Sequence, residues 1–177
     1  MTYLCSMASK KPNILAPSFS DTEVIGINSG LVDFKLAYRL NVKLGLELVR
    51  QQDLLVDDAI YSFYYYNASE NSPVYNLVST VCFDKTLLDF SPRVDYLLII
   101  RNEPTLQLVE TVKSKIMEIE GVGYAFHMDA HKGKLEQTLF DIEQHEVEIR
   151  RILRERNTVA YAKEAARQKE VFLGLIP

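Results

Sequence analysis

The segment Val94-Asp95-Tyr96-Leu97-Leu98-Ile99-Ile100 is the most apolar strand-like run in the chain. Pro92 precedes this run and Asn102-Glu103-Pro104 follows it, where Pro104 suits the first turn of a helix. Its aliphatic and β-branched residues, and its short length between turn residues, are typical of a buried strand. We therefore predict a strand over 94–100 at the centre of a sheet.

The chain downstream of this strand has first a helical and then a strand-like pattern. Apolar residues recur at helical spacing from Leu106 to Ile119 and stop at Gly121, and 122–129 alternates as a strand does. Upstream, β-branched, aromatic or alternating residues predict three antiparallel strands, over 46–50, 60–66 and 74–83.

The first elements of the domain come from the segment 23–45. The apolar run 23–27 predicts a strand, and an amphipathic helix follows over 31–44, with Gly45 where a left-handed C-terminal cap is expected. The predicted order is β-α-β-β-β-β-α-β, an α+β fold with a mainly antiparallel sheet. Both helices should cover one face, as in a ferredoxin-like or related split βαβ sandwich. The strand order stays open.

A long helix is predicted at the C-terminal end. The stretch from Lys134 to about Lys169 contains no Pro or Gly and is rich in Glu, Arg, Gln, Ala and Leu. At about 1.5 Å per residue, such a helix reaches roughly 50 Å. The predicted organisation is a leader over 1–20, an α+β domain over 21–133, and a helix with a tail over 134–177.

Composition narrows the class of protein. The 177 residues are 47% hydrophobic and 25% charged, with a formal net charge of −4. This balance fits one globular domain and gives no global attraction to nucleic acid, which would need a local basic patch. Two cysteines, Cys5 and Cys82, suit a reducing compartment. No run approaches the ~20 apolar residues of a membrane span, so we predict a cytoplasmic protein without a cofactor or a membrane partner.

The long helix offers a contact surface. Its first half is acidic and its second half is basic, which matches the helix macrodipole. An apolar stripe runs through Leu135, Leu139, Ile142, Ile149, Ile152 and Leu153, and His145 or Glu146 interrupts it. We expect the first half to dock on the sheet, and the projecting half to bind a protein partner or a second copy. A solvated, unpartnered helix is the alternative. The cluster Arg150, Arg151 and Arg154 is a candidate phosphate contact.

Two further patterns point to other kinds of site. His127, Asp129 and His131 alternate on one predicted strand, and two imidazoles with a carboxylate suit Zn²⁺ or a similar ion. In the preferred alternative, His127 and Asp129 line the solvated face of the strand and His131 lies in the following turn. In 61–66, aromatic residues alternate onto both faces of a strand. If one face is open to solvent, it could stack RNA bases or bind a small apolar ligand. Core packing is the alternative.

Parts of the segment from about 24 to 140 resemble the bacterial IPExxxVDY family, a set of uncharacterised proteins named for a sequence motif. The similar stretches are 24–27, 33–38 with 40–41 and 44–46, and Val94-Asp95-Tyr96-Leu97-Leu98-Ile99-Ile100. In contrast, Leu88-Asp89-Phe90 stands where the motif has Ile, Pro and Glu. The resemblance supports the fold and supplies no activity. It makes four polar residues candidate binding residues: Asp33, Asn41, Asp95 and Tyr96. For Asp95 a structural role is preferred, as an acceptor of backbone N–H groups near the start of the first helix.

No motif for a catalytic nucleophile, a zinc protease, a nucleotide-binding loop or a redox Cys pair occurs in the chain. The leading hypothesis is therefore a non-enzymatic adaptor or regulatory module that acts through the C-terminal helix. The alternatives are a small-ligand or RNA-binding domain at the tyrosine-rich strand, and a metal-dependent enzyme at His127, Asp129 and His131.

Overall fold

The structure is a computed structural model that describes residues 19–102, 104–128 and 134–172. Its elements follow the order β1 (Thr22–Ser29), α1 (Asp33–Leu44), β2 (Val49–Arg50), β3 (Leu54–Val56), β4 (Ala59–Tyr61), β5 (Phe63–Asn67), β6 (Val74–Ser79), β7 (Val81–Cys82), β8 (Lys85–Thr86), β9 (Tyr96–Arg101), α2 (Leu106–Met117), β10 (Val122–Met128) and α3 (Lys134–Phe172). The predicted α+β class, the mainly antiparallel sheet and the long C-terminal helix are confirmed.

Six of the strands form the main sheet, in the order β10-β1-β9-β6-β5-β2, and every neighbouring pair is antiparallel. The apolar strand β9 lies inside this sheet, as predicted. Because β9 and β10 are both antiparallel to β1, which lies between them, the unit β9-α2-β10 is a split βαβ unit.

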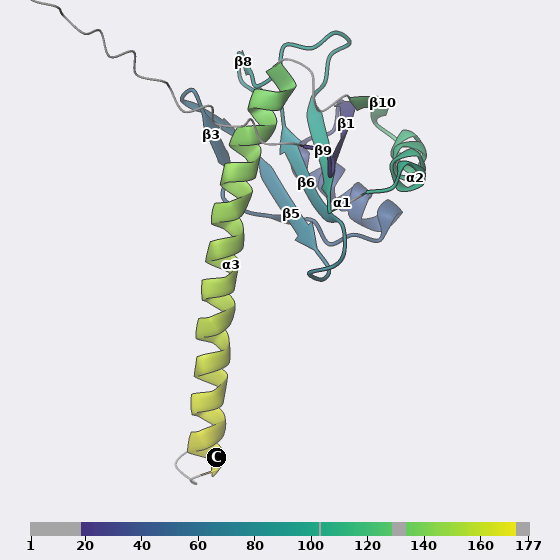
Figure 1. Cartoon of the computed structure of the whole chain (residues 1–177). Coiled ribbons are helices and arrows are strands. Elements are labelled where there is room, and N and C mark those ends of the chain that lie inside the picture. Colours follow the sequence, from purple (N-terminus) through teal and green to yellow (C-terminus); the bar gives the residue numbers. More distant parts are fainter. Residues whose placement is uncertain (1–18, 103, 129–133, 173–177) are drawn as a thin grey trace, which may run out of the picture.

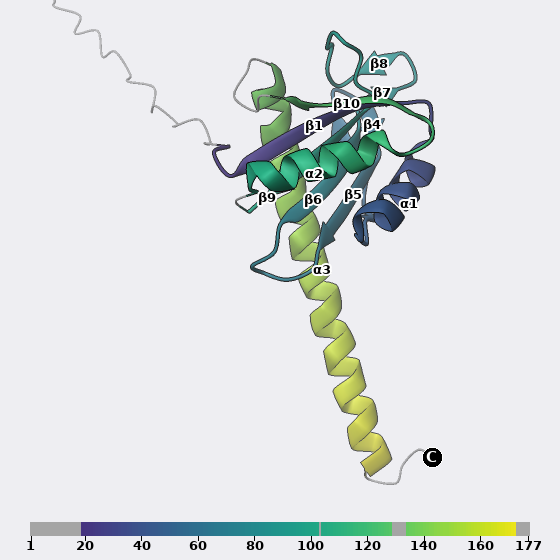
Figure 2. The same cartoon turned by 90° about the vertical axis from the view of Figure 1, so that its right-hand side faces the viewer.

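Helices cover both faces of the sheet. Helices α1 and α2 pack on one face, where Leu40 and Ile116 meet Leu98 and Ile100. The first half of α3 packs on the opposite face, together with the β3-β4 hairpin. Figure 2 shows α1 and α2 in front of the sheet and α3 behind it. The sequence correctly predicts that the two short helices share a face.

Two predicted strands are divided in the structure. The segment 60–66 breaks at Ser62, so β4 pairs with β3 while β5 joins the main sheet. The segment 74–83 breaks at Thr80, whose backbone N–H donates to Asp95 O at 2.9 Å and whose hydroxyl donates to Val94 O at 2.6 Å. These bonds hold the chain where it leaves the sheet.

The β3-β4 hairpin is absent from the predicted elements. Its two-residue turn is Asp57-Asp58, with φ values of 47° and 60°. A turn of this kind needs positive φ at both positions, and Asn-Gly or Asp-Gly is its usual sequence signal. Because the second residue is Asp and not Gly, the sequence gives only a weak indication of the turn.

Helix α3 extends well beyond the rest of the protein. Its 39 residues correspond to about 58 Å, and Figure 1 shows its second half projecting away from the sheet. The predicted range of 134–169 is confirmed within a few residues. In the part of the chain that the structure describes, no helix is both long and apolar enough to cross a membrane.

Candidate functional site

The first half of α3 is fixed to the sheet by one face. Leu135, Leu139, Ile142 and Ile149 are buried against the strands, with the spacing of an amphipathic helix. Glu146 lies on the same face and is only 1% exposed. The apolar stripe predicted from the sequence is thus the docking face, and the glutamate that interrupts it is also buried.

Glu146 is at the centre of a buried ion network. Arg101 of β9 is 5% exposed, and its Nη1 donates to Glu146 Oε2 and, at 3.1 Å, to Asn76 Oδ1. One turn later on α3, Arg150 Nε donates to Glu146 Oε1 at 2.8 Å. Burial works against the charge of Arg150, but Glu146 outweighs this effect and the pKa of Arg150 is raised. The network joins α3 to two strands at the level where the helix leaves the sheet.

Beyond Leu153, which still packs against the core, no described side chain of α3 is buried. Every side chain from Arg154 to Lys163 is exposed. Large apolar side chains remain in contact with water along the helix: Val159 is 52% and Tyr161 is 78% exposed. On the docked half, Phe140 and Val147 face away from the sheet and are 39% and 57% exposed. No described element of the chain covers these four side chains.

The structure separates the three arginines of the predicted cluster. Arg150 turns inward to Glu146, whereas Arg151 turns outward and pairs with Glu148 and Glu155. Arg154 makes no ion pair with any residue that the structure describes. Arg150 and Arg154 both line a hollow between α3 and the β5-β6 turn, and Arg151 does not.

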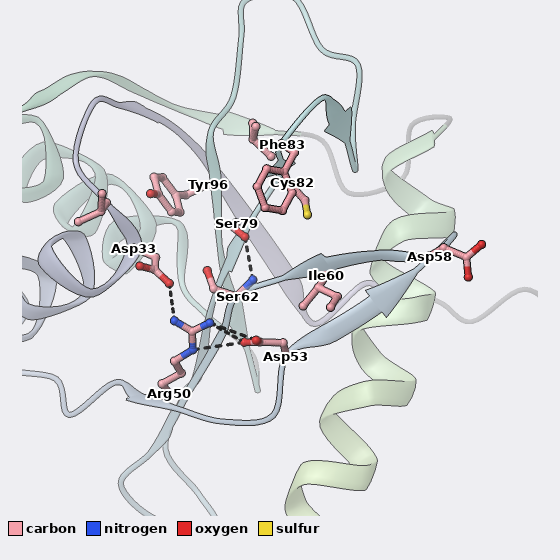
Figure 3. Close-up of a pocket in the computed structure, with 12 residues that line it drawn as sticks. Asp33, Arg50, Asp53, Asp58, Ile60, Ser62, Ser79, Cys82, Phe83 and Tyr96 are labelled. Carbon is pink, nitrogen blue, oxygen red and sulfur yellow. Dashed lines mark hydrogen bonds and ion pairs between the residues drawn. The ribbon is translucent and has the colours of Figure 1, made fainter.

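Figure 3 shows a second polar cluster. It lies in an open pocket beside the β3-β4 hairpin. Arg50 lies between two carboxylates there: Nη1 donates to Asp33 Oδ2 at 2.8 Å and Nη2 donates to Asp53 Oδ1 at 2.9 Å. Burial opposes the charge of Arg50, but Asp53 and then Asp33 outweigh it, so its pKa is raised. One guanidinium therefore bonds to both carboxylates and holds them on either side of it.

Tyr96 and Asp95 hold the connection between β1 and α1. The Tyr96 hydroxyl donates to Leu31 O at 2.7 Å. Asp95 Oδ2 accepts from Asn28 Nδ2 at 2.7 Å and from the backbone N–H of Ser29 at 3.1 Å. This geometry agrees with the structural role predicted for Asp95, an acceptor of backbone N–H groups near the start of the first helix.

Asn41 has a comparable role at the other end of α1. Its side-chain Oδ1 accepts from Leu48 N at 2.8 Å, and its Nδ2 donates to Leu48 O at 3.1 Å. Its backbone carbonyl accepts from Gly45 and Leu46. Both ends of the amide are therefore used to bind the chain after α1, and Gly45 adopts the predicted left-handed conformation with a φ of 69°.

The structure covers only part of the predicted metal trio. His127 lies on β10, and its Nε2 contacts Glu23 Oε2 of the neighbouring strand. Asp129 and His131 lie outside the described residues, so the trio stays a prediction. Within residues 19–102, 104–128 and 134–172, no three His, Cys, Asp or Glu side chains are grouped so that they could hold a metal ion.

The tyrosine-rich strand is covered on both faces. Phe63 is buried beneath α3, where the ring of His145 meets it edge-on at a centroid distance of 4.8 Å. Tyr64 is buried on the face covered by α1. Tyr65 and Tyr66 are half-buried. The open aromatic face that base stacking requires is not found at this strand.

Sequence reasoning missed the partners that complete both polar clusters. Arg50, Asp53 and Arg101 carry no motif, and each reaches its partner only through the fold. The available signal was indirect. Arg101 directly follows the apolar run 94–100, and Glu146 occupies a position on its helix where the spacing calls for an apolar residue. A charge at a core position is a signal for a buried partner elsewhere in the chain.

Comparisons of the chain with protein families, with curated proteins and with solved structures give no match. The resemblance to the IPExxxVDY family therefore stays a prediction, and function has to be inferred from the geometry.

Proposed function

We propose that the protein is a cytoplasmic, non-enzymatic adaptor that dimerises through α3. The main support for this proposal is that α3 exposes apolar side chains at positions separated by multiples of seven residues. Phe140, Val147 and Tyr161 are separated by seven and fourteen residues, so they lie along one side of α3. All three are exposed, and this side of the docked half points away from the sheet.

The charge pattern of α3 supports a second copy as the partner. Residues 134–149 contain five acidic residues and one basic residue, whereas residues 150–169 contain seven basic and two acidic residues. Two such helices complement each other when they run antiparallel, because each acidic half then faces a basic half. A parallel pair would place like charges together. A symmetric antiparallel pair uses the same surface on both copies.

The antiparallel arrangement has a defined register. Val147 of one copy lies beside Tyr161 of the other. The acidic stretch 139–149 then faces the basic stretch 159–169, whereas the arginine-rich stretch 150–156, with Arg154 at its centre, faces its own copy. A polar residue at a central position of a helix pair fixes register at a cost in stability. The two α+β bodies would then lie toward opposite ends of the helix pair, which suits a scaffold that holds two binding surfaces apart.

Light scattering on the intact chain tests the dimer. Wild-type protein should have the mass of a dimer at micromolar concentrations. Val147→Glu and Tyr161→Glu should each weaken the dimer by about 30-fold or more, the effect of losing roughly 2 kcal/mol at an interface. The matched control is Val159→Glu, because Val159 is similarly exposed but lies on a different side of the helix. A wild-type monomer, or dissociation by Val159→Glu and not by Val147→Glu, would contradict the proposal.

Cross-linking tests the orientation. In a background without Cys5 and Cys82, a mixture of Val147→Cys and Tyr161→Cys proteins should form mainly the mixed disulfide-linked pair. A parallel pair would instead link each variant to itself. Circular dichroism on all variants would show whether the helix content of the fold is retained.

A further inference from the structure

The buried network of α3 has an imbalance of charge. One carboxylate, Glu146, faces two guanidinium groups, Arg101 and Arg150. In the described part of the chain, the Nε and Nη2 groups of Arg101 are buried and have no hydrogen-bond partner. A buried positive charge is costly unless an anion or hydrogen-bond acceptors compensate it. The network therefore favours an additional anion nearby.

A hollow of about 470 Å³ adjoins this network, between α3 and the turn that connects β5 to β6. Arg150 and Arg154, one helical turn apart, line one side, and the turn lines the other. We call it the helix–turn hollow. Its volume is within the usual range for small-molecule sites, about 300–1,000 Å³.

The polar groups of the hollow are mostly free donors. Arg154 has no ion-pair partner among the described residues. Asn67 uses its Oδ1 to accept from Ser69 N at 3.0 Å and from Ser72 Oγ at 3.1 Å, which leaves its Nδ2 to donate. The side chains of Ser69 and Asn157 also line the hollow and make no hydrogen bond within the described chain. These donors come from two different elements.

The positive charge of the residues that line the hollow favours an anionic ligand. Glu70 is the only acidic residue among those that line the hollow, against Arg150 and Arg154. Arg101 does not line the hollow but bonds the same carboxylate as Arg150. The planar guanidinium group of arginine can donate two parallel N–H bonds to the oxygens of a phosphate. Such charged hydrogen bonds are stronger than those between neutral groups. The half-buried ring of Tyr65 and the side chain of Leu153 add an apolar wall.

We propose that the helix–turn hollow binds a phosphate group, held by Arg150 and Arg154 from α3, by Asn67 at the end of β5 and by Ser69 from the β5-β6 turn. Such a group would join the turn to the helix where α3 leaves the sheet. All of these residues lie within one copy. Arg154 also lies at the centre of the proposed helix pair, so the two proposals share this residue.

Titration calorimetry at low ionic strength tests this site with two probes, inorganic phosphate and phenyl phosphate. Saturable binding of either probe is expected, and Arg154→Gln should weaken it at least tenfold. The matched control is Arg151→Gln, because Arg151 precedes Arg154 by one turn but pairs with Glu148 and Glu155 on the outer side. This control should bind as the wild type does.

The two probes distinguish the source of the phosphate. Tighter binding of phenyl phosphate would assign a small phosphorylated molecule with an apolar part, whereas equal or weaker binding would assign the free ion. Absence of saturable binding at 10 mM (roughly the weak limit of specific affinity) would overturn the proposal. An equal loss in Arg151→Gln and Arg154→Gln would overturn it as well, since this would show only a general charge effect.

A second variant separates loss of the phosphate site from a change in folding or assembly. Asn67→Asp places a carboxylate in the hollow without altering α3, and it should also abolish binding. Molar mass is recorded on the same samples, so loss of the phosphate site and loss of the dimer are read separately. The dimer variant Val147→Glu should retain phosphate binding.

Discussion

Glu146 of α3 and Arg101 of β9 form an ion pair in the interior of the protein, 45 residues apart in sequence. Both side chains are almost completely buried, and Arg150 contacts the same carboxylate from the solvent side. The pair joins the long helix to the sheet near the end of the docked segment, where Ile149 and Leu153 also pack on the core. The orientation of the projecting half is therefore set by a charge contact as well as by apolar packing.

Removal of Glu146 from this pair should be strongly destabilising. Glu146→Leu alone leaves Arg101 as an uncompensated buried charge, and we expect a loss of about 3–5 kcal/mol in the free energy of unfolding. Arg101→Leu should cost less, because Arg150 still pairs with Glu146. The double variant should recover most of this loss, because both charges are then absent. Urea unfolding measures all three. If the double variant lost as much as the sum of the single variants, the two side chains would not be coupled. Glu148→Leu is the control at an exposed position of the same helix, and a surface pair there contributes little.

Asp95 should stabilise the connection between β1 and α1. Asp95→Ala removes an acceptor for Asn28 Nδ2 and Ser29 N, and we expect a loss of about 1–3 kcal/mol in chemical denaturation. Asp89→Ala is the matched control, since Asp89 is exposed and occupies the part of the family motif that this chain does not preserve. Equal effects of the two substitutions would argue against a structural role for Asp95.

Gly121 should not tolerate a side chain. Its φ is 94°, and a Cβ atom would lie 2.8 Å from the side chain of Leu31. Gly121→Ala combines backbone strain with this contact, so we expect a loss of about 1–3 kcal/mol, read as a lower melting temperature. Gly30→Ala is the control, because no atom lies within 4 Å of the corresponding Cβ. A neutral Gly121→Ala variant would mean that the α2-β10 turn can rearrange.

Alkaline pH should unfold the protein partly through Tyr96. Burial, followed by the charges of Asp33 and Asp95, raises the pKa of Tyr96 from 10.0 to about 12. Because the folded state holds the proton more tightly than the unfolded state, this contribution is complete below pH 10 and is lost as the pH rises toward 12. A difference of this size corresponds to roughly 2–3 kcal/mol.

Unfolding measured between pH 8 and pH 12 checks this sign. Tyr96→Phe should cost about 1 kcal/mol at pH 8, through the lost hydrogen bond to Leu31 O, but its stability should then fall less steeply with pH than that of the wild type. Tyr38→Phe serves as the exposed control. The same alkaline slope in wild type and Tyr96→Phe would rule out this residue as a source of the pH dependence.

The sequence by itself determined which elements exist and which of their faces are apolar. Period-two and helical spacing of apolar residues identified the six strands of the main sheet, the two short helices and α3, because a side chain's face follows from local backbone geometry. Gly45 ended α1 where its left-handed cap was expected. Local pattern did not find the breaks at Ser62 and Thr80, since these depend on bonds to other strands.

Only the tertiary structure decided the strand order and the partners of the charged residues. Strand order depends on contacts between segments distant in sequence, and a repeating pattern of apolar residues carries no information about which strands are adjacent. For the same reason Arg101 and Glu146, Arg50 with Asp33 and Asp53, and the hollow beside Arg154 leave no local motif. They exist because the fold brings together side chains whose charges, once shielded from water, require a partner.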